Sequence, residues 1–251
     1  MKAILSFLAL MILNSSGFPQ SEWRIPKQAD YPNIRKKGTS IERFVPKDFV
    51  IMKSAKGDLN GDSLEDVALV IKGTLPKFMN SNNGLGENIY DTNLRILLVL
   101  LRQNPRSDFR LAARNNDFII PPPSPVNSEP FQDIAISRGI LQIKMELWQS
   151  AGSWSASNTK YRFRLQKGEF LLIGVEQEEY MRNSVETTVS SYNFLAKRVK
   201  KTEGIRETVE NYSAEYRKPR IRWKLLPNIK RKTLRSIGPA FSWEIEPDLF
   251  I

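Results

Sequence analysis

The sequence contains no cysteine and no histidine among its 251 residues. Without cysteine the chain can form neither a disulfide nor a lipid anchor on a cysteine thiol. Without cysteine and histidine it can build neither a Ser-His-Asp nor a Cys-His nucleophile system, nor a zinc site of the usual kind. Any enzyme of this composition would have to use carboxylates, lysine, tyrosine or a bound metal.

Glycine-rich phosphate-binding loops are also missing, and no apolar run reaches the roughly 20 residues that cross a bilayer. The chain begins with Lys2, an apolar run from Ala3 to Leu13, and the small residues Ser15 and Gly17. This three-part pattern predicts a signal peptide at residues 1–17 and a periplasmic or extracellular protein. The alternative is that these residues form an N-terminal helix or strand of the fold.

Acidic residues are absent from residues 217–235, where nine lysines and arginines stand in a chain of net charge +11. Such a basic segment attracts polyanions, although many basic runs are only a solvated face. Outside the cytoplasm the expected partner is an acidic envelope polymer or an anionic lipid, and nucleic acid is a poorer candidate.

One stretch, GDLNGDSLEDVALVI at residues 57–71, carries a sharp chemical pattern. Its polar residues follow the spacing D-x-N-x-D-x-x-x-D and run directly into an apolar segment. Ca²⁺ takes six to eight oxygen ligands, and carboxylates two residues apart in a tight loop can converge on one ion. The predicted ligands are the side chains of Asp58, Asn60, Asp62 and Asp66 and the main-chain carbonyl of Leu64. The alternative is a polar turn that needs no metal.

Two positions separate this stretch from an EF-hand loop. Leu69 stands where an EF-hand has a bidentate glutamate, and Ser63 stands where such loops usually have glycine. A positive φ at a residue other than glycine costs about 1–2 kcal/mol. We therefore expect a calcium site of weak affinity that leads into a strand.

The stretch resembles the calcium loop of FG-GAP/VCBS-type repeats, which occur in integrin-like propellers and in many secreted bacterial proteins. The wider pattern is similar to a group of bacterial envelope proteins with a single such loop. The matching segments are FVPKDFVIMKSAKGDLNGDSLEDVALVI, RILLVLL and WQSAGSWSASNTKYRFRLQKGEFLLIG, which together span roughly residues 44–200. The resemblance implies an exported protein that binds calcium, and it implies no reaction.

Apolar runs predict two strands buried on both faces, at Val67–Ile71 and at Leu94–Leu101. Phe109–Arg114 is expected to pair with the second strand. Residues 73–93 are predicted to be a flexible polar loop, and the proline-rich residues 121–130 a stiff connection outside any sheet interior.

Strict alternation over residues 140–165 predicts half-buried strands, and Arg138-Gly139 and Lys167-Gly168 are predicted hairpin turns. A further strand is expected at Val185–Leu195. Arg220–Leu226 is predicted to be a strand with its basic side facing solvent, and the aromatic residues 241–251 are expected to dock on the body. No second Asp-rich loop is present, which excludes a propeller-length array of such repeats. Residues 204–216 indicate neither helix nor strand clearly.

The fold class that follows is mainly β: an antiparallel meander forming a curved sheet, a sandwich or a partial barrel, with few helices. We expect a lead-in at residues 18–45, which covers an edge of the core, and a single β domain at residues 46–251.

Two weaker candidate sites remain. Trp148 and Trp154 flank a turn and could stack on sugar rings or simply pack. The acidic group Glu176, Glu178 and Glu179 could serve a carboxylate-dependent glycan hydrolase, or it could be a solvated strand end paired with Arg162 and Arg164.

Three functions stay open on the sequence. The first is a calcium-stabilised binding or structural module of the cell envelope without an assigned catalytic activity. The second is a polyanion-binding protein that uses the basic segment, and the third is a glycan hydrolase.

Overall fold

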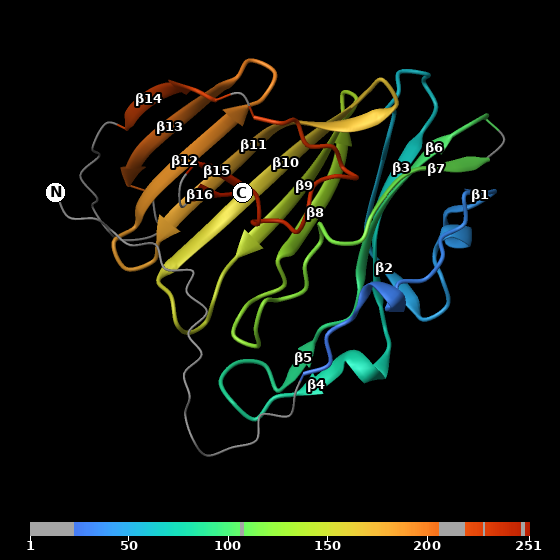
Figure 1. Cartoon of the computed structure of the whole chain (residues 1–251), viewed down its shortest axis with the longest axis horizontal. Helices are drawn as coiled ribbons and strands as arrows, with labels where there is room; N and C mark the ends of the chain where they lie inside the picture. The colour runs from blue at the N-terminus through green and yellow to red at the C-terminus, as the bar shows by residue number, and fades with distance from the viewer. Residues whose placement is uncertain (1–22, 106–107, 206–218, 228, 247–248) are drawn as a thin grey trace, which may run out of the picture.

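The computed structural model describes residues 23–105, 108–205, 219–227, 229–246 and 249–251. These residues form antiparallel strands and three short 3-10 helices, η1 (Gln28–Asp30), η2 (Ile41–Phe44) and η3 (Pro76–Phe78). Two large sheets stand side by side, and neither closes on itself (Figure 1). The prediction of a mainly antiparallel β fold is confirmed. The predicted signal peptide and most of residues 204–216 lie outside the described residues.

The smaller sheet has five strands, in the order β1 (Lys37–Gly38), β7 (Phe109–Asn115), β6 (Arg95–Arg102), β3 (Asp66–Gly73) and β2 (Phe49–Gly57). Its central strands β3 and β6 are buried on both faces, as their continuous apolar runs predict. Pairing of β7 with β6 is confirmed as well.

The larger sheet is a seven-stranded meander. Its strands follow one another in chain order: β8 (Phe131–Ser137), β9 (Ile140–Leu147), β10 (Ser155–Gln166), β11 (Glu169–Met181), β12 (Glu186–Asn193), β13 (Arg198–Ile205) and β14 (Arg220–Leu225). Arg138-Gly139 and Lys167-Gly168 turn two of its hairpins with positive φ at both residues, as in the two-residue turns that match strand twist. The predicted turns are therefore confirmed.

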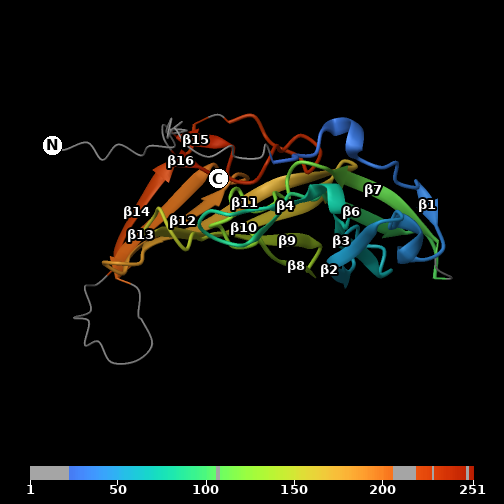
Figure 2. The ribbon, with the colours of Figure 1, turned by 90° about the horizontal axis from the view of Figure 1, so that it is seen from below.

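The main hydrophobic core joins side chains from one face of each sheet with C-terminal residues. Figure 2 shows the C-terminal segment lying over the larger sheet. The smaller sheet supplies residues such as Ala68, Val70, Leu97 and Val99, and the larger sheet supplies Leu141, Ile143, Tyr161, Phe163 and Val175. At the junction of the sheets β2 lies beside β8. There Lys53 Nζ and Asp133 Oδ1 form an ion pair at 3.2 Å.

The N-terminal segment covers the other face of the smaller sheet. Phe44 of η2 is buried in a second core with the opposite side chains of β3 and β6, and Tyr31 and Ile34 pack at its margin. The Tyr31 hydroxyl donates a hydrogen bond to the Asn116 carbonyl at 2.8 Å. The lead-in therefore packs on a face of the smaller sheet, which is more than the edge that its sparse apolar residues predict.

Residues 73–93 are not the flexible polar loop that their composition predicts. They contain η3 and a two-stranded sheet of β4 (Met79–Ser81) and β5 (Ile89–Asp91). Asparagine side chains order the backbone here, beside the buried rings of Phe78 and Tyr90. Asn80 Nδ2 donates to the Tyr90 carbonyl at 3.2 Å, and buried Asn93 accepts from Leu75 N at 2.8 Å. Polar side chains can order a loop by bonding its backbone, and composition alone does not reveal this.

The C-terminal segment docks on the larger sheet, as its aromatic composition predicts. It carries the short strands β15 (Glu244–Glu246) and β16 (Leu249–Phe250), which pair with each other. Leu234 N bonds to the Phe170 carbonyl at 2.8 Å, and Leu172 N bonds to the Lys232 carbonyl at 2.9 Å. These bonds hold residues 232–234 against the start of β11.

Candidate functional site: an acidic loop and a basic edge

The acidic loop joins β2 to β3, with Asp58 after the first strand and Asp66 opening the second. Gly61 has φ of 83° and Ser63 has φ of 64°, so both adopt the left-handed conformation. This is the conformation that calcium loops require at the position of Ser63, and a serine adopts it at a cost of about 1–2 kcal/mol. The expected backbone geometry at Ser63 is therefore present.

Asp58 organises the turn through its carboxylate. Oδ1 accepts hydrogen bonds from Asn60 N at 3.1 Å and Gly61 N at 2.7 Å, and Oδ2 accepts one from Ser63 N at 2.8 Å. Burial opposes the charge, but these N–H donors outweigh it and hold the pKa of Asp58 below its ordinary value. Asp58 is therefore ionised at neutral pH.

Asp66 lies at the bottom of the loop and is fully buried. Its Oδ2 accepts from Leu59 N and its Oδ1 from Arg102 N, each at 2.8 Å. Burial raises the pKa of Asp66, and the two N–H donors lower it by less. The negative charges of Asp62 and Asp58 raise the pKa further. Asp66 thus ties the loop to the end of β6, a link that sequence spacing could not reveal because Arg102 is 36 residues away.

The remaining predicted ligands lie at the exposed end of the loop. Asp62 accepts from Asn60 Nδ2 and from Leu64 N, each at 2.8 Å. Within the described residues, no three acidic side chains lie close enough together to form a metal-binding group. The donors are oxygens of the kind Ca²⁺ prefers and the turn has the required conformation, but the carboxylates of Asp58 and Asp66 bond main-chain N–H groups.

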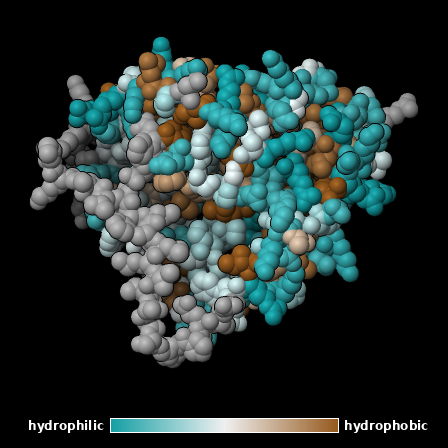
Figure 3. Space-filling view, viewed as in Figure 1, coloured by the Kyte–Doolittle hydropathy of each residue, from teal (hydrophilic) through white to brown (hydrophobic). Residues whose placement is uncertain are grey.

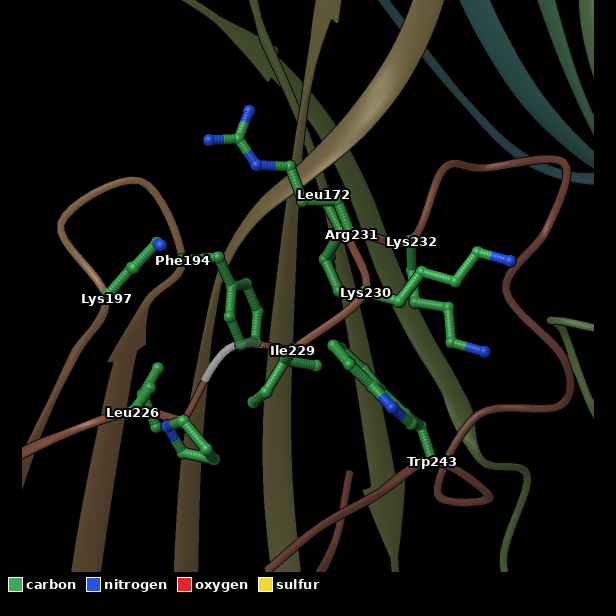
Figure 4. Close-up of a pocket in the computed structure, with 10 residues that line it drawn as sticks. Leu172, Phe194, Lys197, Leu226, Ile229, Lys230, Arg231, Lys232 and Trp243 are labelled. Carbon is green, nitrogen blue, oxygen red and sulfur yellow. The ribbon is translucent and has the colours of Figure 1, made fainter.

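A second feature is a hollow of about 260 Å³ between the larger sheet and the C-terminal segment (Figure 4). Its floor is apolar and aromatic, with Phe194 and Trp243 on either side of Ile229. The rings of Phe194 and Trp243 pack with their centroids 5.3 Å apart. Figure 3 shows that this side of the molecule is mostly hydrophilic, with hydrophobic residues visible between the polar ones.

Four cationic side chains surround this hollow: Lys197, Lys230, Arg231 and Lys232. Of the described residues that line it, none is acidic. Lys232 Nζ lies 5.7 Å from the centroid of the Trp243 ring, a cation–π distance. In Figure 4 the cationic ends point outward in different directions, so they surround the hollow and do not converge on one point.

Strand β14 belongs to the basic segment at residues 217–235 and forms one edge of the larger sheet. The predicted strand is confirmed and its basic side chains face solvent, but they lie on the side of the sheet that carries the core. Its pairing with β13 places Lys224 opposite Val199, which is fully buried, so the basic side of β14 shares the core-facing side of the sheet. The apolar side chains point to the other side and are also exposed. The sheet extends past the core at this edge, so neither face is covered.

The acidic residues of β11 divide between the two faces of the sheet. Glu176 and Glu178 line one hollow on the outer face, as period two requires. Glu176 lies 3.3 Å from Lys160 Nζ and 3.5 Å from Arg162 Nη2. Burial opposes the charge of Glu176, but these cations outweigh it and lower its pKa. A carboxyl with a lowered pKa suits an ion pair better than a general acid.

Trp148 and Trp154 are brought together by a residue that the sequence did not indicate. The Arg182 guanidinium lies 5.0 Å from the Trp148 ring and 5.7 Å from the Trp154 ring, within cation–π range. Its Nη2 donates to the Gln149 carbonyl at 2.9 Å and also bonds the Ser153 carbonyl. Arg182 therefore bonds the 149–153 turn and contacts both tryptophan rings.

In comparisons with known proteins, no family model, curated protein or solved structure matches this chain. In the part of the chain that the structure describes, no helix is both long and apolar enough to cross a membrane.

Proposed function

We propose that this chain is an exported module of the cell envelope. It binds anionic polymers or headgroups at the hollow surrounded by Lys197, Lys230, Arg231 and Lys232. The observation that carries the proposal is the aromatic-floored hollow of Figure 4, with four cationic side chains around it and no described acidic one. Electrostatic complementarity of this kind raises association rates and selects partners by charge. Cations that point in different directions suit a ligand with repeated charges better than one small anion.

The test is binding to heparin, a soluble acidic polysaccharide, at low and physiological salt. Replacing Lys230, Arg231 and Lys232 together by glutamine is expected to weaken binding about tenfold or more at low salt. The matched control replaces Arg35, Lys36 and Lys37 by glutamine, which removes the same charge from exposed positions of the lead-in. Equal weakening by both triple variants would assign the attraction to net charge and reject this site.

We also propose that Ca²⁺ binds the loop at Asp58, Asn60, Asp62, Leu64 and Asp66 and stabilises the fold. Two observations support this: the left-handed conformation at Ser63, and the raised pKa of Asp66, which comes first from burial and then from the charges of Asp62 and Asp58. A bound cation would neutralise that concentration of negative charge. Serine at this turn places the affinity at the weak end, near the about 10⁻⁴–10⁻³ M of extracellular modules.

The melting temperature is therefore expected to rise with calcium and fall with chelator. A ligand specific for the folded state adds about 2.7 kcal/mol at a hundredfold excess over Kd. Asp58→Ala is expected to abolish the response, Glu65→Ala to retain it, and Ser63→Gly to shift it to lower calcium. Glu65 is a suitable control because its side chain points to an exposed ion pair with Lys56. A melting curve indifferent to calcium, with no metal found by elemental analysis, would leave the loop as an ordinary turn.

A further inference from the structure

The outer side of β14 exposes an apolar row that its position in the sheet leaves uncovered. Ile221, Trp223 and Leu225 are 51%, 66% and 71% exposed, and they are alternate residues of one strand. Alternate residues share one face of a sheet, so the three side chains form a single row. Exposed apolar groups gathered in this way mark surfaces that contact a partner.

Cationic side chains of the neighbouring strand β13 lie beside this row. Across the strand pair, Leu225 is opposite Arg198 and Trp223 is opposite Lys200, so both cations share the apolar face. The other side of β14 presents Arg222, which forms an ion pair with Glu203. Such an amphipathic element, with tryptophan and leucine among lysine and arginine, is the composition of segments that lie in a membrane interface.

From this arrangement we propose that β14 docks on the surface of a lipid bilayer that contains anionic headgroups. The inference goes beyond the proposed function, because the apolar row and the cations beside it lie on the face of the sheet opposite the hollow. Indole rings settle at the level of the headgroups, where one part of the ring is apolar and the other is wet. Lysine and arginine beside them gain from the negative surface potential of an anionic leaflet. A fully hydrated polymer offers the cations a partner but gives the apolar row nothing to enter.

The edge position of β14 makes this docking sterically simple. Among the described strands, β13 is its one neighbour in the sheet, so a surface can approach β14 without separating a described strand pair (Figure 1). A second copy of this chain is a poorer occupant, because two chains of net charge +11 would bring their basic edges together.

The experiment measures cosedimentation of the full chain with phosphatidylcholine vesicles, with and without phosphatidylglycerol, and heparin binding in parallel. The double variant Trp223→Ser/Leu225→Ser is compared with Ile25→Ser/Leu85→Ser. The control pair is 65% and 78% exposed, which matches the 66% and 71% of the β14 pair. Circular dichroism establishes that both variants fold.

The expected result is binding of the parent to anionic vesicles, weakened about tenfold in the β14 variant, unchanged in the control, and little change in heparin binding. Vesicle binding equal in all three proteins would overturn the inference. Binding to heparin without binding to vesicles would overturn it and keep the proposed function, and binding to neither would reject both. A parent that is dimeric by light scattering, with a monomeric β14 variant, would show a second copy as the occupant.

Discussion

Strands β6 and β14 show how differently one element type can be used in this molecule. Seven of the eight residues of β6 are buried, and all six residues of β14 are exposed. Yet β14 has the clean alternation of apolar and basic residues, and β6 has almost none. The reason is position: β6 lies between β3 and β7 with cover on both faces, whereas β14 is a sheet edge beyond the core. Alternation says that neighbouring residues take opposite faces, and it does not say that either face is buried.

The largest expected effect sharpens this comparison with one substitution in each strand. Leu98→Ala in β6 is expected to lower the free energy of unfolding by about 2–5 kcal/mol, because it opens a cavity around a fully buried side chain. Leu225→Ala in β14 is expected to change it by less than about 0.5 kcal/mol, since that side chain is 71% exposed. Urea unfolding measures both. A loss at Leu225 comparable to that at Leu98 would show that β14 is covered in solution.

An intermediate effect compares the ion pairs of the two strands. Arg95 begins β6 with a side chain only 1% exposed, and its Nη2 donates to Glu129 Oε2 at 2.7 Å. Glu129→Gln is expected to cost about 1–3 kcal/mol, because it leaves a buried guanidinium without its charged partner.

The matched change at the edge is Glu203→Gln, which removes the partner of Arg222 in β14. The side chains of Arg222 and Glu203 are 54% and 35% exposed, so the expected cost is about 0–1 kcal/mol. Denaturant curves at low and high salt measure the pair of variants. If Glu203→Gln cost as much as Glu129→Gln, burial would not be what separates the two strands.

The smallest expected effect is the pH dependence contributed by Glu176, on a strand between these extremes. Lys160 and Arg162 lower its folded-state pKa. Its stabilisation is therefore fully present above the unfolded pKa of about 4.3 and is lost as pH falls through the lower folded-state value. The stability difference between the parent and Glu176→Gln should shrink over that acid range. Unfolding free energies from pH 6 to pH 2.5 measure it, and a difference that grows towards low pH would contradict the ion-pair role.

Much of the fold could be predicted because its signals are local. Buried runs such as Val67–Ile71, and turn pairs such as Arg138-Gly139, depend on neighbours in sequence. The ordered segment at residues 73–93 could not be predicted, because Asn80 and Asn93 look like loop residues until their backbone partners are known. In the acidic loop, the spacing marked Ser63 as a position of strain, and its φ is 64°, but the bond from Arg102 N to Asp66 depends on a distant strand.

The sequence by itself determined which chemistries are closed to this protein, where strands such as β3, β6 and β9 and two tight turns lie, and which residues carry its charge. These properties follow from side-chain identity and from contacts between neighbours in the chain. Only the tertiary structure decided which side of β14 faces the core, which cations surround the hollow beside Trp243, and how the two sheets divide the buried residues. The physical reason is that burial depends on which distant elements pack together, and a segment's own pattern is the same whether or not anything covers it.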